Sequence, residues 1–268
     1  GVQTCALPIF ALDEGPFSAH ELAAIIATAP ALTAKLLRLA NSPYSGFARR
    51  ITTPREAVVL LGFRSVRSAA LTACMMQTAR ATTTIDAEAF WPFSIATGLL
   101  AEVLARVEGA HPEEAFTAGV MHAIGVVALD QARPEALQAA IALREQRGIS
   151  LAEAEQEILG FTDGDLGGAL ALQWHFPSAL ADAIRDHARP LDTLPDHGSL
   201  TACVLRARMF VRASGLPDGI AASHEPGDLA EEGLPEEWAR PPLSVALRQR
   251  GGMEKVMEQV EALIGTLG

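Results

Sequence analysis

The stretch from Leu22 to Thr72, LAAIIATAPALTAKLLRLANSPYSGFARRITTPREAVVLLGFRSVRSAALT, contains the signals that determine the fold class. Apolar residues such as Leu32 and Leu36 recur at intervals of three and four, which is the spacing of one helix face. Residues 53–56 (TPRE) form a capping box with proline at the first helical position. Gly62 stands where that helix should end. The stretch therefore predicts consecutive short helices joined by tight turns.

The same pattern continues along the rest of the chain. Ser150 with Glu153 forms another capping box, and Gly148 and Gly160 stand at expected helix ends. No segment shows the sustained alternation and β-branched enrichment of strands. We therefore expect an all-α fold with no significant sheet. Helices are predicted over 18–28, 30–41, 54–61, 64–80, 87–107, 113–131, 135–147, 151–159, 163–174, 178–188, 199–214 and 243–265.

Composition excludes several classes of protein. The 268 residues are 49% hydrophobic, which is enough to build a core and too much for a disordered chain. No run approaches the roughly 18 unbroken apolar residues of a membrane span. Cys5, Cys74 and Cys203 are too few and too scattered for a disulfide framework or a zinc knuckle. We expect a cytoplasmic protein without a membrane partner.

Charge divides the chain into two parts. Residues 10–80 carry eight basic and four acidic side chains, whereas residues 81–268 carry 13 basic and 28 acidic ones. The whole chain has a net charge of -11 and a pI near 5.1, which argues against nucleic-acid binding by the whole molecule. The positive N-terminal part nevertheless offers arginines to an anionic partner.

Two segments stand apart from the helical pattern. Residues 1–9, GVQTCALPI, match in order the translation of a short-read library adapter, and we expect them to be a technical scar. Phe10 to Gly15 then resembles the remaining part of an opening helix. Loss of the rest of that helix would leave apolar surface exposed, so self-association of the chain is one expectation. Residues 215–242 are rich in Pro, Gly and acidic residues, and we expect a solvated loop before a closing helix in 243–268.

Five segments resemble the HD-related output domain (HDOD) family of bacterial signalling proteins, over about residues 17–214. The first is Leu22–Thr72, and the others are FWPFSIATGLLAEVLA (90–105), EEAFTAGVMHAIGVVAL (113–129), LGFTDGDLGGALALQWHFP (159–177) and ALADAIRDHARP (179–190). The resemblance implies a two-lobed, all-α domain over residues 10–214, related to HD-type metal phosphohydrolases. It also implies a regulatory output that usually lacks activity and is sometimes preceded by a receiver domain.

The positions at which the resemblance places the metal ligands of HD enzymes are mostly altered. They fall at Phe93, at the pair His122-Ala123, at His187-Ala188 and, less firmly, at Arg208. A phenyl ring and methyl groups cannot bind a metal, and a guanidinium repels one. We expect a vestigial site with no catalysis and no cofactor, in which His122 is a core histidine bonded to backbone. His187, near a helix end, is expected to be exposed or to cap that helix.

The sequence therefore predicts a non-catalytic module of bacterial signal transduction that binds a partner protein. The candidate partner-binding residues lie in the basic N-terminal part: Asn41, Tyr44, Arg49, Arg50, Arg55, Arg64 and Arg67. One alternative is a residual metal-dependent phosphohydrolase that uses His122. Another is a nucleotide- or nucleic-acid-binding module that uses the same arginines, whose binding would fall steeply with salt. The glycines of DGDLGGAL (163–170) are expected to allow close helix packing.

Overall fold

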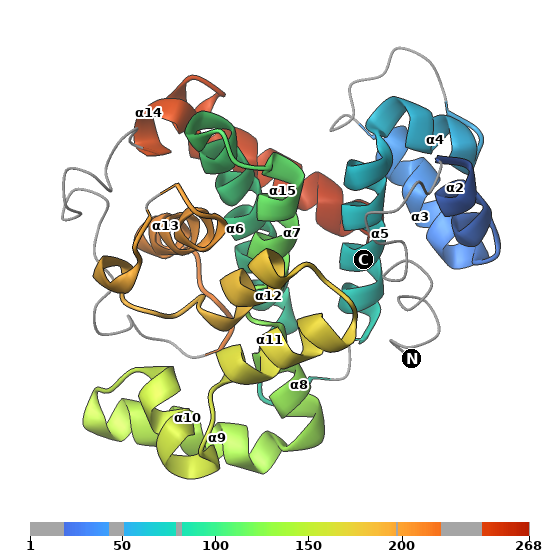
Figure 1. Ribbon diagram of the computed structural model, residues 1–268. Helices are drawn as coiled ribbons and strands as arrows, with labels where there is room; N and C mark the ends of the chain where they lie inside the picture. Colours follow the sequence, from blue (N-terminus) through green and yellow to red (C-terminus); the bar gives the residue numbers. More distant parts are fainter. Residues whose placement is uncertain (1–18, 43–50, 79–81, 197, 221–242, 268) are drawn as a thin grey trace. The chain divides into compact units, whose positions relative to one another are not determined.

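The computed structural model describes residues 19–42, 51–78, 82–196, 198–220 and 243–267, and within these ranges every regular element is helical (Figure 1). This confirms the predicted all-α fold. The elements in chain order are α2 (Ala19–Ala27), α3 (Pro30–Ala40), α4 (Pro54–Leu61), α5 (Phe63–Thr78), α6 (Ala87–Glu108), α7 (Pro112–Met121), α8 (Ile124–Ala132), α9 (Pro134–Arg147), α10 (Leu151–Leu159), α11 (Asp163–Gln173), α12 (Ser178–Arg185), the short 3-10 turn η2 (Leu191–Thr193), α13 (Leu200–Ala213), α14 (Leu243–Arg248) and α15 (Gly252–Leu267).

Two helices that the sequence predicted as continuous are broken. The segment 113–131 divides into α7 and α8 at His122-Ala123, where the Ala123 backbone leaves the helical region and the His122 ring bonds to the carbonyl of Gly119. The segment 243–265 divides into α14 and α15, because Gly251 and Gly252 adopt positive φ angles of 96° and 77°. Both single-helix predictions were wrong, although the remaining predicted helices agree with the structure to within about three residues.

The chain divides into two compact units, which are described separately. Unit 1 comprises residues 1–80, 174–176 and 257–268, and unit 2 comprises residues 81–173 and 177–256. In unit 1, helices α2 to α5 pack around buried Leu22, Ile26 and Val58. The Thr53 hydroxyl accepts a hydrogen bond from the Glu56 backbone N–H at 3.2 Å, which is the predicted helix cap.

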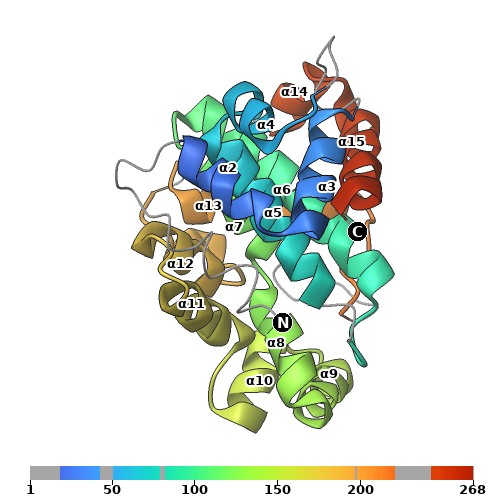
Figure 2. The same cartoon turned by 90° about the vertical axis from the view of Figure 1, so that its right-hand side faces the viewer.

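Unit 2 is built on the antiparallel pair α6 and α7, which lie side by side in Figures 1 and 2. The two helices touch at Gly98 and Gly119, where a Cβ added to Gly119 would lie 2.6 Å from the Gly98 Cα. The segments 87–108 and 112–132 are long and apolar enough to cross a membrane, but 78% and 83% of their most apolar windows are buried inside the structure. Such burial on all sides is typical of the central helices of a folded core.

Glycines also set the distance between α11 and α12. A Cβ at Gly164 would lie 2.2 Å from the backbone oxygen of Arg185, and one at Gly167 would lie 2.9 Å from the Ile184 side chain. The expectation that the DGDLGGAL glycines serve helix packing is confirmed. This close approach brings Asp163, at the start of α11, next to the turn that follows α12.

Candidate functional site

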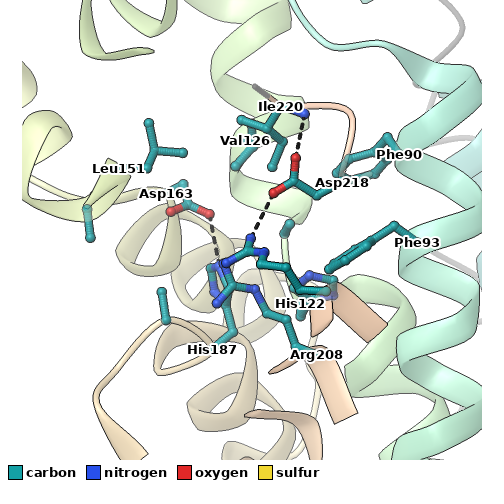
Figure 3. Close-up of a pocket in the computed structure, with 14 residues that line it drawn as sticks. Phe90, Phe93, His122, Val126, Leu151, Asp163, His187, Arg208, Asp218 and Ile220 are labelled. Atoms are coloured by element: carbon teal, nitrogen blue, oxygen red, sulfur yellow. Dashed lines mark hydrogen bonds and ion pairs between the residues drawn. The ribbon is translucent and has the colours of Figure 1, made fainter. Parts of the chain in front are cut away.

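Unit 2 contains a small polar pocket at the place where the resemblance locates the HD site (Figure 3). Its volume of about 10 Å³ is close to the space that one water molecule needs. Helices α6, α8, α10, α11 and α13 contribute to it, together with the segments that follow α7, α12 and α13. The lining residues are Phe90, Phe93, His122, Ala123, Val126, Leu151, Ala152, Asp163, His187, Ala188, Arg208, Arg212, Asp218 and Ile220.

His122 lies at the break between α7 and α8 and is buried. Its Nδ1–H donates to the Gly119 carbonyl at 2.6 Å, in agreement with the expectation of a backbone-bonded core histidine. Burial lowers the pKa of His122 well below its usual 6.5, and the neighbouring His187, Arg208 and Arg212 lower it further. The imidazole is therefore neutral at physiological pH.

His187 is also buried, so it is not exposed, but its ring bonds to a carbonyl of the last turn of α12 and thus caps that helix, which was the other expectation. Helix α12 ends at Arg185, and the following turn directs the His187 ring back toward α11. Its Nδ1–H donates to the Ile184 carbonyl at 2.8 Å, and its Nε2 faces the Asp163 carboxylate at 3.4 Å. The rings of His187 and His122 meet edge to face, with centroids 5.4 Å apart.

Two buried arginines from one face of α13 complete the charged lining. Arg208 and Arg212 are four residues apart, which places both on the same side of the helix. Arg212 Nη2 donates to the Asp218 carboxylate at 2.8 Å, and its guanidinium lies 5.8 Å from the centre of the Phe93 ring. Asp218 itself is buried.

The position of Asp218 corrects one expectation from the sequence. Gly215 and Pro217 are exposed as expected, but Asp218 is buried and enters the pocket together with Ile220 (Figure 3). Residues 221–242 lie outside the described residues. The closing part of the chain, expected as one helix in 243–268, is the pair α14 and α15.

The residues present do not fit a divalent metal ion of the HD type. Phe93 and Ala123 offer no donor atom, and Arg208 brings a positive charge to the same pocket. Catalytic metal sites typically use three protein ligands. Within the described ranges no three His, Cys, Asp or Glu side chains are grouped as a metal ion would require. The charged groups that line the pocket beside its apolar residues are arginines and aspartates of the protein itself.

The candidate partner-binding residues are only partly described. Asn41 has a structural role, because its side chain donates to the Ile51 carbonyl and accepts from the Ile51 N–H, at 2.8 and 2.7 Å. Arg55 is exposed on α4. Tyr44, Arg49 and Arg50 lie outside the described residues, and Arg64 and Arg67 lie on α5 with side chains that are not described.

Sequence reasoning missed three charged residues of the pocket, Asp163, Arg212 and Asp218. The four-residue spacing from Arg208 to Arg212 on one helix is a signal that points to Arg212. Asp163 and Asp218 enter the pocket through tertiary packing, for which the local sequence gives no sign.

The described part of the chain is an all-helical protein with a small, partly polar pocket in unit 2. The sequence profile of the HDOD domain matches residues 9–190, and the chain therefore belongs to the HDOD domain family. This confirms the resemblance seen in the sequence.

Solved structures share the fold at low sequence identity. An HDOD domain protein of unknown function from Geobacter sulfurreducens is 22% identical, with a TM-score of 0.79 over 97% of this chain and 91% of that one. A protein from Shewanella amazonensis SB2B, named as an inferred phosphohydrolase, is 22% identical, with a TM-score of 0.67 over 98% and 88%. A protein from Marinobacter aquaeolei VT8, named as an inferred signal transduction protein, is 22% identical, with a TM-score of 0.71 over 98% and 59%.

A curated relative comes from Treponema pallidum (strain Nichols) and is named only as an uncharacterized protein. It is 24% identical over 204 residues, which cover 75% of this chain. The chain spans about two fifths of the length of that relative, because the match covers 40% of it.

Proposed function

We propose that this chain is a non-catalytic, cytoplasmic output module of bacterial signal transduction that acts by binding a partner protein. The proposal rests on one observation: residues that cannot bind a metal ion line the pocket at positions where the resemblance expects metal ligands. Phe93, Ala123 and Arg208 stand where the resemblance expects ligands, and all three line the pocket that His122 shares.

The surviving pocket groups do not support hydrolytic chemistry. His122 is neutral and its Nδ1–H is committed to a backbone carbonyl. The carboxylate of Asp218 is held by Arg212 at 2.8 Å, and that of Asp163 faces His187. A metal-activated water needs an open coordination position beside several ligands. These contacts favour a non-catalytic role for the pocket.

The basic N-terminal part remains the proposed partner-binding surface. Arg55 is exposed on α4, and Val59 beside it is 67% exposed, so this helix presents both charge and apolar area to solvent. Interfaces combine a buried apolar contact with charged residues that set specificity and association rate. The partner is therefore expected to offer an acidic rim around an apolar contact.

Charge reversal tests this proposal. The full chain and its Arg49→Glu/Arg50→Glu variant are used to capture partners from an extract of the source bacterium, and a captured protein is then titrated in purified form. The variant should bind at least about ten-fold more weakly, since reversal of close charges costs more than about 1.4 kcal/mol. The matched control is Arg133→Glu/Arg248→Glu, which makes the same charge change at exposed residues of unit 2.

Three outcomes would contradict the proposal. Unchanged binding by the Arg49→Glu/Arg50→Glu variant would exclude this surface. Hydrolysis of a phosphodiester by the purified chain, lost in His122→Ala, would replace the regulatory function by the enzymatic one. Binding of a nucleic acid that falls steeply with salt would favour the nucleic-acid alternative instead.

A further inference from the structure

Residues 215–220, called the strap from here on, run from the end of α13 across the mouth of the pocket (Figure 3). The strap has the sequence Gly-Leu-Pro-Asp-Gly-Ile and is not helical. Two hydrogen bonds join Asp218 and Gly219 to neighbouring elements, and a third lies within the strap. Arg212 Nη2 donates to Asp218 Oδ2 at 2.8 Å, the Ile220 N–H donates to Asp218 Oδ1 at 3.0 Å, and the Asp86 N–H donates to the Gly219 carbonyl at 2.8 Å.

The carboxylate of Asp218 is held as a bound ligand would be. Arg212 is nine-tenths buried and presents a planar fork of donors, which suits a carboxylate. Arg208, one helical turn earlier, lines the same pocket and adds a second positive charge on that helix face. The pocket therefore favours an acidic side chain at this position over a neutral one.

The next residue of the strap must be glycine. Gly219 has a φ of 73°, and a Cβ there would lie 2.4 Å from the Asp86 oxygen and 2.6 Å from the Phe90 nitrogen. Both neighbours are backbone atoms at the start of α6, which cannot give way as a flexible side chain would. This position of the strap therefore accepts glycine and no residue with a side chain.

An aliphatic residue completes the pattern. Ile220 lines the pocket together with Phe90 and Val126, two apolar side chains from α6 and α8 (Figure 3). Three consecutive positions of the strap thus meet three separate requirements: a carboxylate, no side chain, and an aliphatic group. Such a run of requirements is how domains recognise short peptide segments.

We propose that the pocket is a recognition site for an Asp-Gly-aliphatic segment of a partner protein, and that the strap is a built-in competitor for it. The inference rests on the proposed function, because it names a segment by which a partner is recognised. The strap is a non-helical segment whose Asp218 and Gly219 are joined to the helices by one hydrogen bond each, and such segments open at lower free energy than packed helices. Its tether gives it an effective concentration on the order of millimolar, so an incoming segment must displace it.

The test uses the strap sequence itself as a probe. A capped peptide Leu-Pro-Asp-Gly-Ile is titrated by isothermal calorimetry into the full chain and into its Asp218→Asn variant. Removing the strap carboxylate frees the pocket, so the variant should bind the peptide at least roughly ten-fold more tightly than the wild type does. The matched control is Asp182→Asn, which removes the carboxylate of an exposed ion pair with Arg185 and should bind as the wild type does.

Peptide and protein variants distinguish this recognition from simple charge attraction. Peptides carrying Asp218→Asn or Gly219→Ala should not bind to the Asp218→Asn chain. The doubly substituted Arg212→Gln/Asp218→Asn chain should bind no peptide. Equal binding of these altered peptides, equal binding of acetate alone, or no binding of the original peptide to the Asp218→Asn chain would overturn the proposal.

A second measurement covers the case in which Asp218→Asn prevents folding. In the wild-type chain, saturating peptide should displace the strap and increase hydrogen exchange at the Ile220 amide, while the Gly219→Ala peptide should not. Unchanged exchange at saturating peptide would overturn the inference. Partner capture that depends on Arg49 and Arg50 would still stand in that case, so failure here is separable from failure of the proposed function.

Discussion

The contact between α11 and α12 offers a sharp test of how the pocket is assembled. In Gly164→Ala, the new Cβ would lie 2.2 Å from the Arg185 backbone oxygen, whereas carbon and oxygen normally approach to about 3.3–3.6 Å. The two helices must move apart by roughly 1 Å, and overpacking of this kind costs about 1–3 kcal/mol. The movement also separates Asp163 from His187, which the close approach now holds at 3.4 Å.

The matched control is Gly265→Ala in α15. There a Cβ meets nothing within 4 Å, so the substitution should gain the usual advantage of alanine over glycine in a helix, about 0.5–1 kcal/mol. Urea unfolding followed by circular dichroism measures both variants. We expect the free energy of unfolding to differ between them by about 2–4 kcal/mol. A Gly164→Ala chain as stable as the wild type would refute the packing described for α11 and α12.

Three further predictions follow from buried groups. The pKa of His122 is lower in the folded chain than its unfolded value near 6.5, so below that pH the unfolded chain binds one proton more than the folded chain does. The free energy of unfolding, measured by urea titration, should therefore fall as the pH drops below about 6.5. The His122→Asn variant should show a weaker dependence of this free energy on pH. Burial raises the pKa of the Cys203 thiol to about 12, so peptide mapping should show alkylation of Cys203 at pH 8 only after unfolding. The carboxylate of Glu108 lies 2.7 Å from buried Arg206, so Glu108→Ala should lower the free energy of unfolding by about 3–5 kcal/mol. Glu157 belongs to an exposed ion pair, so Glu157→Ala should lower it by less than about 1 kcal/mol.

The sequence predicts the helices well because their signals are local. The capping box at Ser150 and Glu153 forms as expected, with both reciprocal hydrogen bonds present. Gly148 and Gly160 end their helices in the left-handed conformation that favours glycine. Such signals need only a few consecutive residues, so they can be read without knowledge of the rest of the chain.

The pocket is predictable only in part because it is built from tertiary contacts. The resemblance identified Phe93, His122 and Arg208, and all three line one pocket. It did not identify Asp218, which reaches the pocket only because the strap folds back against α6. The burial of His187 likewise depends on the close approach of α11 and α12. Neither arrangement has a local sequence signal.

The break at His122-Ala123 has the same explanation. Segment 113–131 keeps a helical apolar pattern throughout, so periodicity alone predicts one helix. The hydrogen bond from the buried His122 ring to the Gly119 carbonyl accompanies the break between α7 and α8. The buried hydrogen bond of the His122 ring to the backbone thus outweighs the preference of segment 113–131 for one continuous helix.

The metal content of the purified full chain tests the central claim most directly. Elemental analysis after gel filtration, following growth in medium with iron, manganese and magnesium, gives the number of metal ions per chain. The account predicts a value near zero, because Phe93, Ala123 and Arg208 replace ligands with groups that offer no donor or that repel a cation. One or more metal ions per chain, lost in His122→Ala, would contradict the account and identify the pocket as a working metal site.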